Sequence, residues 1–213
     1  MDYICREESN CNPIIYLMKT AGIFIFDNVE LLDFAGPYEV FSVANELSGF
    51  SLLHTFTVSE SGKSIRSVHG LEIVADYSID NCPPPGILVI PGGDGTKALL
   101  ENQRVLNWIH ETFRNAETTY TVCSGARIPA KLGLLDNVPF TTHHQVIEDV
   151  MKIAPGAIYR EGARFVDQGK LMTAGGISAG IDISLYVIEK MFGKAVREAT
   201  QKYMEYGDWA KHA

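Results

Sequence analysis

The chain has 213 residues, of which 46% are hydrophobic and 21% are charged, a composition typical of a soluble globular domain. Its formal net charge of −8 at pH 7 argues against nucleic acids and anionic membrane surfaces as partners, because basic faces bind both. No apolar run is long enough to span a bilayer, and the first residues lack the pattern of a secretory signal. We therefore expect a cytoplasmic protein.

The cysteines are Cys5, Cys11, Cys82 and Cys123. None falls in a C-x-x-C pair, so neither a zinc site nor a thioredoxin-like motif is expected. In a reducing cytosol these residues should be free thiols.

The first half of the chain alternates between apolar, β-rich runs and helical patterns. Residues 1–18 are polar and irregular, and we expect a poorly ordered extension followed by a single domain over 19–213. The expected elements are a strand over 19–26, a helix over 36–49 with Pro37 in its first turn, a strand over 54–60, a strand pair over 64–79 and a strand over 83–93.

The second half continues this alternation. It predicts a helix over 96–115 with Thr96 as N-cap, a strand over 118–123, a helix over 125–135, a strand over 138–144, a helix over 145–155, a hairpin over 163–176 and two closing helices over 178–193 and 194–207. Strands that alternate with helices of ten residues or more indicate an α/β fold. We expect a mostly parallel central sheet with helices on both faces.

Cys123 stands where a buried strand ends and a helix begins, with Ser124, Gly125 and Ala126 forming a tight turn. Ligands of open α/β sheets bind at the carboxyl ends of the strands. Such a turn presents its side chain as a nucleophile elbow does, and a helix start favours thiolate and offers N–H groups to an anion. The alternative is a small apolar residue that packs at the end of the strand.

Three other segments can reach the same edge of the sheet. Gly92 and Gly93 end a neighbouring strand, and glycine there lets the backbone approach a ligand; the alternative is an ordinary turn. Asp33 follows the first strand and could instead cap a helix. His143 and His144 end a later strand and could be ordinary loop residues.

No cofactor or metal is expected from the sequence. Adjacent histidines point in different directions on a strand, so His143 and His144 do not form a chelating pair. The segment "PGGDG" lacks the spacing of a dinucleotide-binding fingerprint, and there is no phosphate-binding loop of the Walker type.

Several of these motifs together carry a family resemblance. The segments "VIPGG", "TVCSGA", "TTHH" and "MTAGGISAGIDISL" occur in an order and spacing that resemble the ThiJ/PfpI superfamily. The resemblance implies a class I glutamine-amidotransferase-like, flavodoxin-like α/β sandwich. Within the superfamily, "DNVELLDFAGPYEVF" and "TAGGISAGID" resemble the branch that contains isocyanide hydratases and the amino-terminal ligand domains of AraC-type regulators.

The resemblance assigns roles to residues already singled out. It implies a reactive Cys123, an acidic partner at Asp33, oxyanion donors at the backbone N–H groups of Gly93 and Ser124, and a histidine near the cysteine at His143. It also implies a homodimer. A peptidase branch carries His directly after its cysteine, so Ser124 argues against a Cys-His-Glu peptidase. The chain ends at "YGDWAKHA" without a helix-turn-helix region, so a DNA-binding role is not expected.

A thiol, a carboxyl group, a hydroxyl and amide donors suit covalent attack on a small electrophile. We expect an enzyme that hydrates an isocyanide to an N-substituted formamide, with Cys123, Asp33 and Ser124 as catalytic residues. Gly92, His143 and His144 would contribute to substrate binding. The alternatives are a glyoxalase or deglycase activity on α-oxoaldehydes, or a non-catalytic domain that binds a metabolite or senses oxidation.

Overall fold

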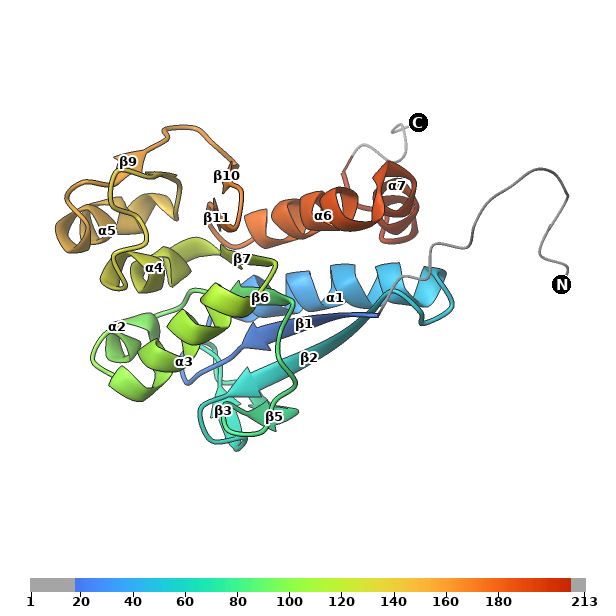
Figure 1. Ribbon diagram of the computed structural model, residues 1–213, viewed down its shortest axis with the longest axis horizontal. Coiled ribbons are helices and arrows are strands. Elements are labelled where there is room, and N and C mark those ends of the chain that lie inside the picture. The colour runs from blue at the N-terminus through green and yellow to red at the C-terminus, as the bar shows by residue number, and fades with distance from the viewer. Residues whose placement is uncertain (1–17, 208–213) are drawn as a thin grey trace, which may run out of the picture.

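The structure is a computed structural model that describes residues 18–207, and its centre is one seven-stranded sheet. The strands lie in the order β10-β11-β7-β6-β1-β2-β5 (Figure 1). Every neighbouring pair is parallel except β10 and β11, which form an antiparallel hairpin. The predicted α/β fold with a mostly parallel sheet is confirmed. The predicted extension over residues 1–18 lies, apart from Met18, outside the described residues.

The sheet strands are β1 (Lys19–Phe24), β2 (Leu53–Ser59), β5 (Tyr77–Ser78), β6 (Ile87–Ile90), β7 (Thr118–Thr121), β10 (Phe165–Gln168) and β11 (Leu171–Ala174). Two small separate pairs are β3 (Ser64–Arg66) with β4 (Glu72–Val74) and β8 (Pro139–Phe140) with β9 (Ile158–Tyr159). The helices are α1 (Leu31–Leu47), α2 (Thr96–Leu99), α3 (Gln103–Asn115), α4 (Arg127–Lys131), α5 (Ile147–Ile153), α6 (Ala179–Phe192) and α7 (Lys194–Tyr203).

Helices cover both faces of the sheet (Figure 1). Tyr120 of β7 is fully buried; its ring lies 6.4 Å from that of Phe41 in α1, and its hydroxyl lies 2.6 Å from that of Ser184 in α6. Phe24 of β1 packs on the other face, 5.5 Å from the ring of Trp108 in α3. Because strand side chains alternate between faces, the apolar runs of these central strands supply both halves of the core.

Two helix predictions need correction. The helix expected over 96–115 is two helices, since Asn102 caps the second by accepting a hydrogen bond from the Val105 N–H, and Thr96 is the first residue of α2 rather than a cap. The helix expected from residue 36 begins at Leu31, and Pro37 therefore lies inside it. No side chain caps that earlier start, so there is no capping residue from which it could be predicted.

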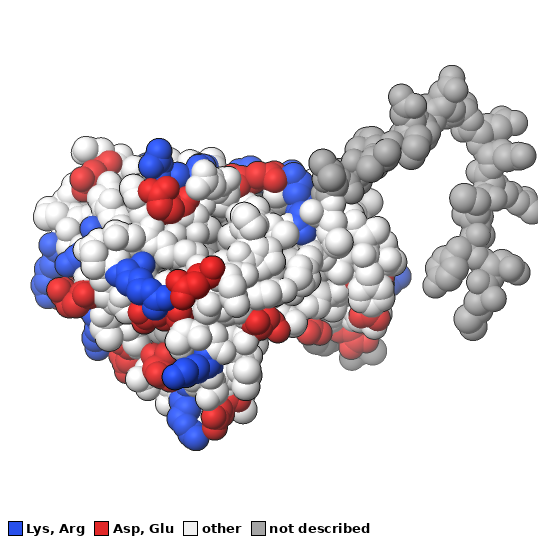
Figure 2. All heavy atoms as spheres, turned by 60° about the horizontal axis from the view of Figure 1, so that its bottom comes forward, with Lys and Arg blue, Asp and Glu red and all other residues white. Residues whose placement is uncertain are grey.

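No helix between residues 18 and 207 is long and apolar enough to span a membrane. On the face shown in Figure 2, blue basic groups lie next to red acidic ones. Ion pairs between exposed side chains, such as Lys97 with Asp94 and Arg104 with Glu60, also bring opposite charges together on the surface. The displayed face therefore has no continuous stripe of one charge.

The fold brings four strand ends together. β11, β7, β6 and β1 are neighbours, and all four run in the same direction. The segments that follow them contain Ile177, Cys123, Gly92 and Asp33 respectively. Residues separated by up to 144 positions thus meet at one edge, where ligands of such sheets bind.

Replacement of Gly125 tests the close approach of the turn after β7 to the neighbouring strand. A Cβ atom at Gly125 would collide with the backbone carbonyl oxygen of Ile90, which has no room to move. Overpacking of this kind typically destabilises by about 1–3 kcal/mol, so Gly125→Ala should lower the midpoint of chemical denaturation. Gly156→Ala, where the nearest atom to the added carbon lies 3.5 Å away, is the matched control and should change the midpoint much less. Equal midpoints for the two variants would contradict the tight turn.

Candidate active site

Cys123 occupies a strained turn directly after β7. Its φ angle is 54°, in the left-handed region that non-glycine residues seldom adopt. Its N–H donates to the Gly175 carbonyl at 2.9 Å, and its carbonyl accepts from the Thr142 hydroxyl at 2.7 Å. Neighbours on two sides therefore hold the strained conformation, and the side chain, only 8% exposed, reaches the wall of a pocket.

Asp33 lies beside the cysteine. It is in the first turn of α1 and is fully buried, with its Oδ2 accepting a hydrogen bond from the Gly92 N–H at 2.8 Å. The carboxyl group is also hydrogen-bonded with the Cys123 thiol. Its Oδ1 is buried and has no hydrogen-bond partner among the described residues. The predicted proximity of the two residues is thus present.

Burial sets the protonation of this pair. It raises the pKa of Asp33 to about 7, while the Gly92 N–H opposes the rise. Burial and then the charge of Asp33 raise the pKa of Cys123 to about 12, against the N–H groups of Ser124 and Ile177 that favour the thiolate.

The expectation that a helix start lowers the thiol pKa is therefore wrong for Cys123 beside a charged Asp33. The helix that follows is short: a 3₁₀ turn over Cys123–Ala126 leads into α4, which has 5 residues. Its dipole is correspondingly weak beside the effect of burial. Asp33 is charged above pH 7, and its charge then adds to the effect of burial on the pKa of Cys123.

Ser124 and Gly93 are hydrogen-bonded to each other. The Gly93 N–H donates to the Ser124 hydroxyl at 2.8 Å, and that hydroxyl also lies 3.1 Å from the Gly93 carbonyl, to which it donates. The Gly93 amide, expected as an oxyanion donor, is thus engaged within the protein. The Ser124 N–H points to the sulfur. Gly92 must be glycine, since a Cβ there would lie 2.7 Å from Asp33 Oδ2 and 2.6 Å from the Ser124 nitrogen.

The two histidines differ. His143 lines the same pocket as Cys123, and its Nδ1 accepts from the Gln145 N–H at 3.3 Å. Its ring packs against Gly176, where a Cβ would collide with it. Burial, and next the neighbouring His144, lower the pKa of His143, so that it is neutral at pH 7. His144 is exposed and does not line the pocket.

The pocket has a volume of about 380 Å³. It also contains residues that the sequence did not single out, among them Glu30, Arg127 and Ile177. Arg127 is 5% exposed and donates to the Thr96 hydroxyl at 2.9 Å and to Asp149 at 2.6 Å. Its position in the helix after the cysteine was the available signal.

Ile177 follows the glycines of "TAGG" and directs its N–H at the sulfur. The strand-ending glycine pair was the signal for it.

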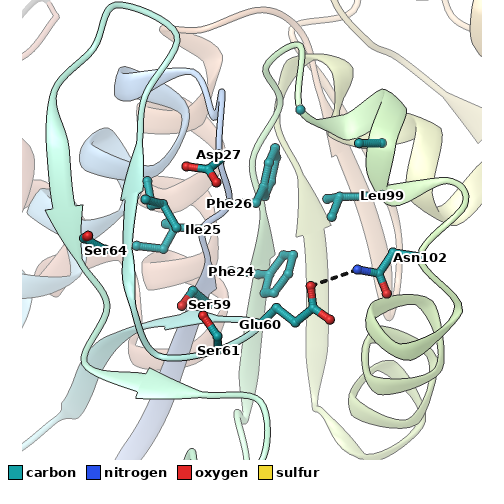
Figure 3. Close-up of a pocket in the computed structure, with 13 residues that line it drawn as sticks. Phe24, Ile25, Phe26, Asp27, Ser59, Glu60, Ser61, Ser64, Leu99 and Asn102 are labelled. Carbon is teal, nitrogen blue, oxygen red and sulfur yellow. Dashed lines mark hydrogen bonds between the residues drawn. The ribbon is translucent and has the colours of Figure 1, made fainter.

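Another hollow, of about 260 Å³, lies beyond the carboxyl ends of β1 and β2 (Figure 3). None of the predicted site residues lines it, and its Glu60 already accepts hydrogen bonds from Asn102 and Arg104. Residues 18–207 also contain no group of three His, Cys, Asp or Glu side chains that could hold a metal ion. The pocket at Cys123 is therefore the candidate active site.

A model of the DJ-1/PfpI family matches residues 19–190. The chain belongs to the DJ-1/PfpI family. An isonitrile hydratase from Pseudomonas putida is 29% identical to this chain over 188 residues. The matched region covers 87% of this chain and 77% of that protein.

A transcriptional regulator and a protein of known structure are also similar to this chain. The transcriptional regulator GbdR from Pseudomonas aeruginosa is 25% identical over 197 residues, covering 92% of this chain and 52% of the regulator. The chain thus spans about half the length of that relative. A ThiJ/PfpI family protein from Pseudomonas syringae superposes with a TM-score of 0.81 at 24% identity, covering 96% of this chain and 82% of that one, which supports the fold.

Asp33→Asn should stabilise the protein in a pH-dependent way. The folded pKa of about 7 exceeds the ordinary aspartate pKa of 3.8, so the stability that protonated Asp33 contributes is complete below pH 4 and is lost as pH rises through 7. The neutral variant does not suffer this loss. The difference in unfolding free energy should grow between pH 4 and 7, then level off at no more than about 4 kcal/mol. Urea denaturation at pH 4, 5.5, 7 and 8.5 measures it, and a constant difference would contradict the raised pKa.

The same substitution should speed alkylation of Cys123. At pH 8.5 Asp33 is charged and opposes the thiolate, and asparagine removes that charge. We expect a several-fold higher rate of iodoacetamide modification at Cys123, measured by mass spectrometry of the peptides. The rate at Cys82 in the same sample is the internal control and should not change. A slower rate at Cys123 in the variant would show that Asp33 does not oppose the thiolate.

Proposed function

We propose that this protein is a cysteine-dependent enzyme that hydrates an isocyanide to an N-substituted formamide. The observation that carries the proposal is the strained Cys123 hydrogen-bonded to a buried Asp33 whose pKa is about 7. A carboxyl group with a pKa near the working pH can both give and take a proton, as this reaction requires. The similarity to an isonitrile hydratase supports the choice of substrate.

The first half-reaction would join sulfur to carbon. The Cys123 thiol first transfers its proton to the Asp33 carboxylate, and the resulting thiolate donates its electron pair to the terminal carbon of R–N≡C and forms the C–S bond. Asp33 gives its proton to that carbon, which yields a thioimidate, R–N=CH–S–Cys, and leaves a carboxylate. The N–H groups of Ser124 and Ile177, which are directed at the sulfur, stabilise the thiolate before attack.

The second half-reaction would restore the enzyme. The Asp33 carboxylate takes a proton from water while the oxygen adds to the thioimidate carbon, and the nitrogen then receives that proton. When the new hydroxyl returns its proton to Asp33, the C–S bond breaks. The products are R–NH–CHO, a thiolate and protonated Asp33, so that one water has been added, and return of the proton to the sulfur regenerates the starting pair.

The other residues would position this pair. The Ser124 hydroxyl holds the Gly93 loop through two hydrogen bonds, and both residues line the pocket. The apolar side chains of Val68, Val146 and Ile177 line the same pocket and would contact the organic group of the substrate. His143, neutral at pH 7, would contribute shape and a polar edge rather than charge.

Turnover of p-nitrophenyl isocyanide, followed as formamide by chromatography, tests the proposal. Cys123→Ala should give no detectable product, because the covalent step is lost. Asp33→Asn should reduce kcat about 10²–10⁴-fold, because proton transfer is lost. Cys82→Ala is the matched control for removal of a thiol and should retain wild-type activity, and circular dichroism verifies that each variant is folded.

The same assay set separates the alternatives. Consumption of methylglyoxal that depends on Cys123, without formamide production, would replace the proposal by an α-oxoaldehyde activity. If neither compound is turned over and a small metabolite raises the melting temperature, the domain binds a ligand, as the similarity to regulators would favour.

A further inference from the structure

The loop after β11, residues 175–178, packs against Cys123: its Gly175 carbonyl accepts the Cys123 N–H at 2.9 Å, and Ile177 lines the same pocket as Cys123. The Ile177 N–H is one of the two backbone N–H groups that favour the Cys123 thiolate. The φ angle of Ile177 is 46°, a conformation that strains a β-branched residue. Such a conformation persists only where the surrounding structure holds it. The question is which contacts hold this loop against the cysteine.

Arg164, which directly precedes β10, binds the loop at its beginning and at its end. Its carbonyl accepts the Gly175 N–H at 2.9 Å, and Gly175 in turn accepts the Cys123 N–H at 2.9 Å. Its guanidinium donates through Nη2 to the Ser178 hydroxyl at 2.9 Å. One residue thus brackets the segment that contains Ile177.

The guanidinium is itself oriented by α6. Arg164 Nε donates to Asp182 Oδ2 at 2.6 Å, and the other oxygen of Asp182 accepts from the Tyr206 hydroxyl at 3.0 Å. The planar fork of arginine suits two acceptors at once, one on Ser178 and one on Asp182, which a lysine ammonium cannot engage in the same geometry. On the opposite side of the loop, the His143 ring packs against Gly176.

We propose that Arg164 is a positioning residue that keeps the Ile177 N–H directed at the Cys123 sulfur. It touches neither the pocket nor the sulfur, and it acts through Gly175 and Ser178. The consequence for turnover, a lower kcat at unchanged KM in Arg164→Ala, rests on the proposed function. The placement of the Ile177 amide does not, and it can be measured in the resting protein.

Hydrogen exchange of the Ile177 amide, measured by nuclear magnetic resonance, tests the proposal. Arg164→Ala should speed exchange at Ile177 about 2- to 5-fold, the upper part of the range expected for half-exposed charged contacts, while the Val187 amide in the middle of α6 stays unchanged. Ser178→Ala should have a similar effect, because it removes the hydroxyl to which Arg164 donates. The Ser178 side chain does not cap α6, so the substitution should leave that helix intact. Arg164→Lys should restore part of the protection.

Two controls decide whether the effect passes through the sulfur. Arg197→Ala removes an ion pair of similar kind, with Glu189 at 2.9 Å, and should leave Ile177 exchange at the wild-type rate. In a Cys123→Ala background the acceptor is gone, so Arg164→Ala should change Ile177 exchange less than about two-fold. An unchanged rate in Arg164→Ala, equal effects in both backgrounds, or an equal effect of Arg197→Ala would each overturn the proposal. If exchange responds but no isocyanide is turned over, the positioning role stands and the proposed function fails.

Discussion

The site depends on one interaction, the hydrogen bond between a thiol and a carboxyl group that are both removed from water. Desolvation penalises a charge on either group, and two adjacent charges would be penalised further, so the pair retains at least one proton near neutral pH. The surrounding groups serve this pair. Gly92 donates to the carboxylate, while Ser124 and Ile177 direct their N–H groups at the sulfur. These three donors follow three different strands, β6, β7 and β11. They surround the pair only because these strands are neighbours in the sheet.

Close backbone contacts make that convergence possible. Gly93 and Gly95 lie so near the loop after β1 that a side chain on either would collide with the carbonyl oxygens of Asn28 and Asp27. The same loop leads into α1, whose first turn carries Asp33. The Glu30 N–H also donates to the Gly92 carbonyl at 2.9 Å. Backbone packing between the segments after β1 and β6 therefore fixes where α1 begins, and with it the position of Asp33 relative to Gly92.

The alternation of strands and helices could be predicted because apolar periodicity and turn residues are local, and the strand-end positions of Cys123 and Asp33 followed from it. The features that the sequence analysis missed depend on contacts between residues far apart in the chain. The early start of α1 has no capping side chain, and the left-handed conformation of Ile177 is imposed by its neighbours. The thiol pKa was misjudged because the depth of burial is a property of the assembled core, and a short stretch of sequence does not report it.

A carboxyl group with a pKa near 7 also makes the pair responsive to what enters the pocket. An apolar ligand against Val68, Val146 and Ile177 would displace water near the pair and raise the pKa of Asp33 further. The carboxyl group would then keep its proton, and the charge that opposes the thiolate would disappear. The same displacement of water would bury the sulfur further, so loss of the Asp33 charge and stronger burial would act in opposite directions on the pKa of Cys123.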